Sequence, residues 1–72
     1  MATSVSREDI EATDVFQSLD KTKQQFVAKK HNIDWLKSNY IIATNLGHEQ
    51  WLKQCGNATQ INKEIIHELL NK

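Results

Sequence analysis

Residues 32–43 read NIDWLKSNYIIA and hold the chain's only tyrosine, one of its two tryptophans and its densest group of β-branched apolar residues. At helical spacing four of these residues make one stripe, and Trp35 and Ile42 lie on a neighbouring face. The stripe consists of Ile33, Leu36, Tyr40 and Ala43. A stripe this wide predicts a helix over 33–44, capped by Asn32 and contacted by neighbours on two sides.

Two helices are expected before this one. Ser6 is suited to cap a helix over 7–19, whose apolar residues recur at helical spacing. Asp20 or Thr22 can then cap a helix over 21–30. No glycine or proline separates the two, so a single fused helix remains an alternative. Residues 1–5 are small and mostly polar, which predicts a disordered terminus.

Two further helices are expected after it. Gly47 can take the positive φ that ends a helix, and a short helix over 48–55 follows. Gly56-Asn57 is the next stop, and Thr59 caps a last helix over 59–71 with the clearest apolar stripe of the chain. The sequence therefore predicts an all-α fold, one domain over 1–72, as a compact up-and-down bundle of five short helices, or four if the first two fuse.

Size and composition narrow the class of protein. A chain of 72 residues with one cysteine forms no intramolecular disulfide, so its net stability is expected to be only about 3–5 kcal/mol. No apolar run reaches the length of a transmembrane helix, and the first residues lack the features of a signal peptide. These features favour a location in the cytoplasm or at the periphery of the inner membrane.

Charge is unevenly spread although the net charge is zero. Residues 1–20 carry five acidic residues against Arg7, and residues 21–37 carry five lysines against Asp34. Two helices with complementary solvated faces would explain this pattern. The alternative is a weakly basic surface that attracts anionic lipid or nucleic acid.

Catalytic and metal-site patterns are weak. The three histidines fall at different helix ends or faces, and Glu64-x-x-His67 is a single copy of a motif that di-iron bundles need twice. Cys55 could act as a nucleophile beside a histidine, but a small, buried apolar role fits its short helix better. We therefore expect no enzyme activity, no cofactor and no metal site.

Nucleic acid is also not expected as a partner. A helix-turn-helix would use residues 59–70 as its recognition helix, which contains no arginine. Glu64 and Glu68 on that helix would face the phosphates unfavourably.

The run HNIDWLKSNYIIATNLGHEQWLKQCGN, within a small helical chain free of disulfides, resembles the bacterial PAS factor family. That family comprises small proteins associated with the release of periplasmic proteins. The resemblance implies a saposin-like fold of five helices related to proteins that contact lipid. It supplies no catalytic residues.

The function expected from these observations is a non-enzymatic interaction with membrane lipid, preferring anionic headgroups, through apolar surface that a rearrangement of the helices exposes. The resemblance implies that this interaction promotes secretion or release of periplasmic proteins. The expected apolar contacts are Trp35, Trp51, Ile41 and Ile42, and the expected electrostatic contacts are Lys29, Lys30, Lys37 and Lys53. Either tryptophan could instead fill a gap in the core. The alternative function is a small protein-interaction module that docks a partner helix or forms a homodimer.

Overall fold

The computed structural model of the chain describes residues 5–55 and 58–71, and within these ranges every regular element is an α-helix. The helices are α1 (Arg7–Glu11), α2 (Asp14–Gln17), α3 (Lys21–Val27), α4 (Lys30–Leu46), α5 (His48–Gln54) and α6 (Gln60–Leu70). The all-α prediction is confirmed, with six helices in the described residues instead of five. The all-helical fold and the single cysteine are consistent with the expected saposin-like arrangement.

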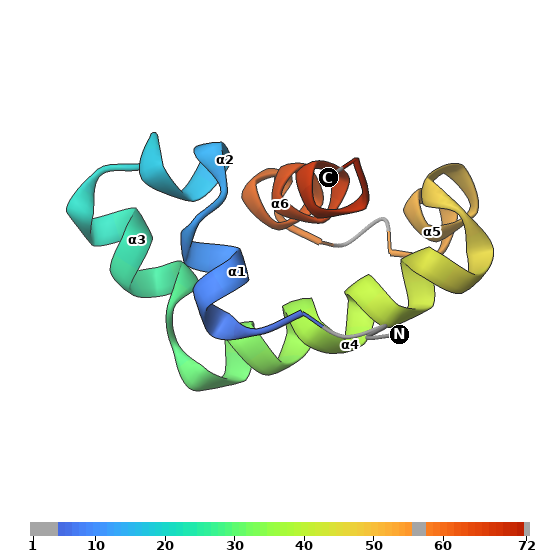
Figure 1. The fold of residues 1–72 in the computed structure, drawn as a ribbon, viewed down its shortest axis with the longest axis horizontal. Coiled ribbons are helices and arrows are strands. Elements are labelled where there is room, and N and C mark those ends of the chain that lie inside the picture. Colours follow the sequence, from blue (N-terminus) through green and yellow to red (C-terminus); the bar gives the residue numbers. More distant parts are fainter. Residues whose placement is uncertain (1–4, 56–57, 72) are drawn as a thin grey trace.

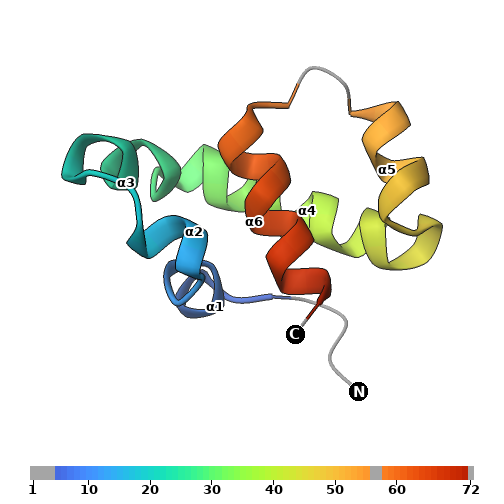
Figure 2. The ribbon, with the colours of Figure 1, turned by 90° about the horizontal axis from the view of Figure 1, so that it is seen from above.

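The arrangement is built on α4, the longest helix (Figure 1). α6 crosses over α4, α5 flanks the crossing on one side, and the three short helices α1–α3 lie on the other side (Figure 2). The core forms where α4 and α6 face each other. Its buried residues include Ile33, Leu36 and Ala43 from α4 and Ile65, Ile66 and Leu69 from α6. Both apolar stripes expected from the sequence therefore face inward.

The helix predicted over 7–19 is interrupted, which corrects that prediction. Thr13 is fully buried between α1 and α2. Its hydroxyl donates to the Ile10 carbonyl at 2.7 Å and accepts from the Phe16 amide at 3.1 Å. These two side-chain bonds satisfy backbone groups at the end of α1 and the start of α2, and so offer the backbone an alternative to a continuous helix. The break therefore has a local cause.

The start of α2 also depends on a residue from the other end of the chain. The carboxylate of Glu68, on α6, accepts from the Asp14 amide at 2.8 Å and from the Val15 amide at 3.1 Å. A negative charge at a helix N-terminus satisfies unpaired amides and opposes the helix dipole. Glu68 thus fastens α2 to α6.

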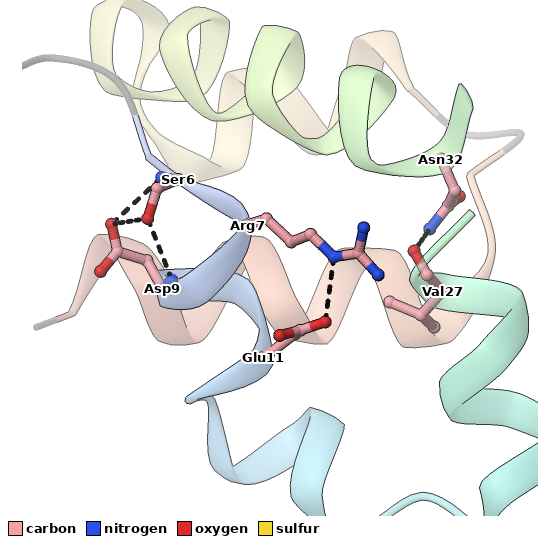
Figure 3. Close-up of polar contacts among 6 residues, drawn as sticks. All are labelled: Ser6, Arg7, Asp9, Glu11, Val27 and Asn32. Atoms are coloured by element: carbon pink, nitrogen blue, oxygen red, sulfur yellow. Dashed lines mark hydrogen bonds and ion pairs between the residues drawn. The ribbon is translucent and has the colours of Figure 1, made fainter. Parts of the chain in front are cut away.

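The boundary between the second and third predicted helices lies earlier than expected. α3 ends at Val27, Lys29 is the N-cap of α4 without a side-chain bond, and Asn32 lies inside α4 instead of capping it. The Asn32 amide nitrogen donates to the Val27 carbonyl at 3.0 Å, which Figure 3 shows. Asn32 is buried because it joins α4 to the end of α3 and to α6.

Several predicted helix boundaries are confirmed. Ser6 caps α1 in a reciprocal capping box with Asp9 (Figure 3), and Asp20 and Thr59 cap α3 and α6. Gly47, at φ 88°, joins α4 to α5. The stop expected at Gly56-Asn57 lies outside the described residues.

The predicted disorder of residues 1–5 is wrong for Val5, which is buried in the core. Val5 precedes the Ser6 cap, and Ile10, four positions into the helix, is also buried. These are the two positions of a hydrophobic staple, which fixes how the chain enters a helix. Residues 1–4 lie outside the described residues.

Candidate functional site

The structure separates the predicted membrane-contact residues into three groups. Trp51 is 1% exposed and belongs to the core, so it could contact lipid only if the helices rearranged. Its indole nitrogen donates to Asn39 Oδ1 at 3.1 Å, and its ring meets that of Trp35 edge-on, with centroids 6.3 Å apart. Because of this hydrogen bond, the indole N–H is buried without being left as an unsatisfied donor.

The second group is an apolar strip along α4. Ile42 is 41% exposed and Trp35 is half-buried. Leu46, which the sequence reasoning missed, is also 41% exposed. At 3.6 residues per turn, these three side chains leave the helix within about 40° of one another. The spacing of Leu46 from Ile42 was the signal that could have identified it. We call Trp35, Ile42 and Leu46 the α4 apolar strip.

The third group lies on another flank of the same helix. Lys30, Lys37 and Ile41 also fall within about 40° of one another, and this flank is turned by about 140° from the α4 apolar strip. Ile41 is 38% exposed, Lys30 is exposed and Lys37 is half-buried. We call these three residues the lysine flank. The surface of α4 that faces solvent therefore has Ile42 and the α4 apolar strip along one edge and Ile41 and the lysine flank along the other.

The lysines differ in how they are engaged. Lys30 pairs with Asp34 at 3.3 Å in an exposed pair within α4, an arrangement that contributes little stability. Lys29 Nζ lies 5.6 Å from the ring centroid of Phe26, the most exposed large apolar residue at 49%. Lys53 is exposed on α5. The predicted lysines thus do not form one cluster, although Lys29 and Phe26 together present a second, smaller apolar and basic patch.

Cys55 has the properties of a structural thiol. It is half-buried and its thiol donates to the Trp51 carbonyl at 3.0 Å. Burial raises the pKa of the Cys55 thiol above its usual 9.0, against a smaller opposing effect from the positive charge of Lys63. Because the thiolate is the nucleophile, a raised pKa makes this cysteine less reactive at neutral pH.

An open groove of about 950 Å³ lies beside α6 and brings two histidines together. His48 of α5 and His67 of α6 line it, and their ring centroids are 4.6 Å apart. The sequence reasoning placed these histidines apart, because nothing local indicates that the ends of α5 and α6 meet. Among the described residues, no group of three or more histidine, cysteine or acidic side chains could hold a metal ion.

α6, the helix that would serve in DNA recognition, packs in the core. Asn62 of α6, one of its few base-reading side chains, is buried, and its side-chain amide is hydrogen-bonded to that of Asn32. Lys63 is half-buried. Asn62 could reach a base edge only if α6 left the core.

Across residues 5–55 and 58–71, no helix is both long enough and apolar enough to cross a membrane. Comparison of the chain with models of protein families, with curated proteins and with solved structures gave no match.

Proposed function

We propose that the chain is a non-catalytic protein that binds the surface of anionic membranes through α4. The observation that carries the proposal is the exposure of Ile41, Ile42 and Leu46, three large apolar side chains, on the longest helix. Of these, Ile42 and Leu46 lie together with Trp35 in the α4 apolar strip, and an exposed apolar strip favours contact with another apolar phase. The neighbouring lysines suit a surface that carries negative charge.

The contact is a shallow one. α4 lies parallel to the membrane with its solvent-facing surface toward the lipid, so that the α4 apolar strip along one edge of this surface and Ile41 along the other reach the headgroup region. The polar side chains between Ile41 and Ile42 also face the headgroups. Trp51 remains in the core in this adsorbed state, so Trp35 is the tryptophan that meets lipid.

Charge sets the preference among lipids. Lys29, Lys30 and Lys37 all belong to α4 or the turn before it. Asp34 is the one acidic residue there, whereas the acidic residues of α1 and α2 lie on other helices. Each lysine close to an anionic surface contributes about 1 kcal/mol, an effect that salt weakens. Binding is therefore stronger on anionic vesicles and declines as salt rises.

The resemblance to the PAS factor family extends this proposal to a biological role. On that resemblance, contact with the cytoplasmic face of the inner membrane promotes the release of periplasmic proteins.

A second function is favoured by one specific observation. The α4 apolar strip contains no lysine, and the lysine flank lies about 140° away around the helix. A strip of apolar residues at helical spacing also suits an amphipathic helix of a partner protein, or the same strip of a second copy. Such a partner would bind without any preference among lipids.

Co-flotation with vesicles tests the proposal. We expect the protein to float with anionic vesicles, to float poorly with zwitterionic vesicles, and to be released by salt. Replacing Ile41, Ile42 and Leu46 together by serine should abolish flotation. The matched control, which should leave flotation unchanged, is the replacement by serine of three exposed glutamines on other helices, Gln17, Gln25 and Gln54. No flotation on any vesicle at low salt would reject the membrane proposal.

Tryptophan emission separates shallow adsorption from opening of the bundle. A Trp51→Phe protein retains only Trp35, and its emission should shift to shorter wavelength on anionic vesicles. A Trp35→Phe protein retains the buried Trp51, whose emission should not shift further. If the Trp51 emission changes instead, the bundle opens on the membrane and the shallow contact is wrong. Concentration-dependent association without lipid would favour the protein partner.

A further inference from the structure

The groove beside α6 contains a contact that the proposed membrane surface does not use. The imidazole of His48 lies between two rings: its centroid is 6.1 Å from that of Trp51, nearly parallel at 27°, and 4.6 Å from that of His67. His48 begins α5 and His67 lies near the end of α6. The two histidines therefore form a direct bridge between these helices.

The imidazole of His48 has a buried nitrogen atom with no group among the described residues to accept a hydrogen bond from it. Its Nε2 atom is buried, and in the described part of the chain it has no hydrogen-bond partner. A positive charge on a buried nitrogen without an acceptor is far more costly than a neutral imidazole in the same place. Protonation of His48 therefore favours any movement that brings water to this atom.

The ring of His67 contacts the side chain of Asn71. The Asn71 amide nitrogen donates to the His67 carbonyl at 2.8 Å, which fixes the orientation of that amide. The same nitrogen lies 3.2 Å from His67 Nε2, a contact that is a hydrogen bond when this ring nitrogen carries no proton.

Among the described residues that line the groove, the other charged groups come from α6. Glu64, Lys63 and Glu68 line the same groove, while the groove residue from α2 is the apolar Val15 and the other from α5 is Leu52. Glu64 is exposed, and Glu68 is occupied by the amides at the start of α2. Glu64 and Lys63 carry opposite charges along the groove, and no acceptor in the described part of the chain bonds the buried nitrogen of His48.

We propose that His48 and His67 form a pH-sensitive latch between α5 and α6. Near neutral pH the two uncharged rings pack together and hold the helices closed. Histidine gains charge as the pH falls below about 6, and two adjacent charges then repel each other. The groove widens so that water reaches both rings.

The connections of α5 determine what can move. Trp51 and its bond to Asn39 hold α5 against α4. Gly47, with no atom within 4 Å of the position a Cβ would take, forms the turn before His48. α5 therefore moves away from α6 while remaining attached to α4, and the groove side of Trp51 becomes accessible.

The test uses full-length protein carrying Trp35→Phe, so that emission comes from Trp51 alone, in buffers containing a chelator. Acrylamide quenching of Trp51 is measured between about pH 8 and pH 5. We expect quenching to rise several-fold as the pH falls. His67→Gln should reduce this rise, because it removes the repulsion between two charged rings, and His67 is exposed, so its replacement leaves the core intact. His31→Gln, at an exposed histidine on α4, is the matched control and should retain it.

Amide hydrogen exchange provides the second measurement. The amides of α5 should exchange faster at the acidic end, after correction for the intrinsic pH dependence, and those at the centre of α4 should not. Quenching that is constant with pH would overturn the latch, as would an equal rise in the His67→Gln protein. Neither result depends on membrane binding, so the latch and the proposed function succeed or fail separately.

Discussion

Asn32 of α4 and Asn62 of α6 exchange hydrogen bonds across the core. Asn62 Nδ2 donates to Asn32 Oδ1 at 3.0 Å, and Asn32 Nδ2 lies 3.3 Å from Asn62 Oδ1. Both side chains are buried, at 7% and 6% exposure. A reciprocal amide pair is satisfied only in one alignment of the two helices, so it selects the register in which the apolar stripes meet.

The first prediction concerns this pair. Asn62→Ala should lower the free energy of unfolding by about 1–3 kcal/mol, because it leaves the Asn32 amide buried with an unsatisfied oxygen. Urea denaturation measures the change. Asn45→Ala, at an exposed asparagine of α4, is the matched control and should change stability by about 0.5 kcal/mol at most. Equal effects in the two proteins would show that the pair has no structural role.

The second prediction concerns the attachment of α2. Glu68→Ala removes the acceptor for the Asp14 and Val15 amides, so it should destabilise the protein by about 1–3 kcal/mol. The amides of α2 should also exchange faster with solvent. Glu64→Ala, one turn earlier on α6 and exposed, should have little effect on either measurement. Unchanged exchange in α2 after Glu68→Ala would contradict the assigned role.

The Asn32–Asn62 pair and the bonds from α2 to Glu68 join residues far apart in the chain, and contacts of this kind could not be predicted from the sequence. Ser6, Asp20, Gly47 and Thr59 act on the residues beside them, so local patterns identified the corresponding helix ends. The break at Thr13 was missed because periodic apolar residues continue across it. Its second cause, Glu68, lies 54 positions away from Asp14 in the chain.

The same limit applies to the candidate site. The exposure of Ile41 and Ile42 follows from the helical spacing around the buried stripe, and so does that of Leu46. The burial of Trp51 does not, because it depends on where α5 returns against α4 and on the acceptor that Asn39 supplies. The approach of His48 to His67 likewise requires two helix ends to meet in space.

The third prediction compares the tryptophans. Trp51→Ala should destabilise the protein by about 3–5 kcal/mol, close to its expected total stability, because it removes a fully buried ring and its hydrogen bond. Trp35→Ala should have a smaller effect, since Trp35 is half-buried. Circular dichroism with temperature should show the Trp51 variant largely unfolded. A folded Trp51→Ala protein would mean that α5 contributes little to the core.

The fourth prediction concerns the turn between α4 and α5. Gly47 has φ 88° and ψ 154°, a backbone region that other residues rarely adopt. Gly47→Ala should therefore cost about 1–3 kcal/mol of stability. Because nothing lies within 4 Å of the added Cβ, the loss comes from the backbone and not from a clash. Gly47→Asn should lose about as much as Gly47→Ala, since asparagine tolerates positive φ in the left-handed helical region and not at ψ 154°. A much smaller loss in Gly47→Asn would argue for another cause.

The fifth prediction follows from the raised pKa of Cys55. The fraction of thiolate at neutral pH is lower than for a free thiol, so alkylation by iodoacetamide should be slower in the native protein than in the urea-unfolded chain. The rate should increase with pH through the alkaline range. Lys63→Gln removes the charge that lowers this pKa and should slow alkylation further. Lys53→Gln, at an exposed lysine of α5, is the control and should leave the rate unchanged. Faster alkylation in Lys63→Gln would mean that Lys63 acts by covering the thiol and not by its charge.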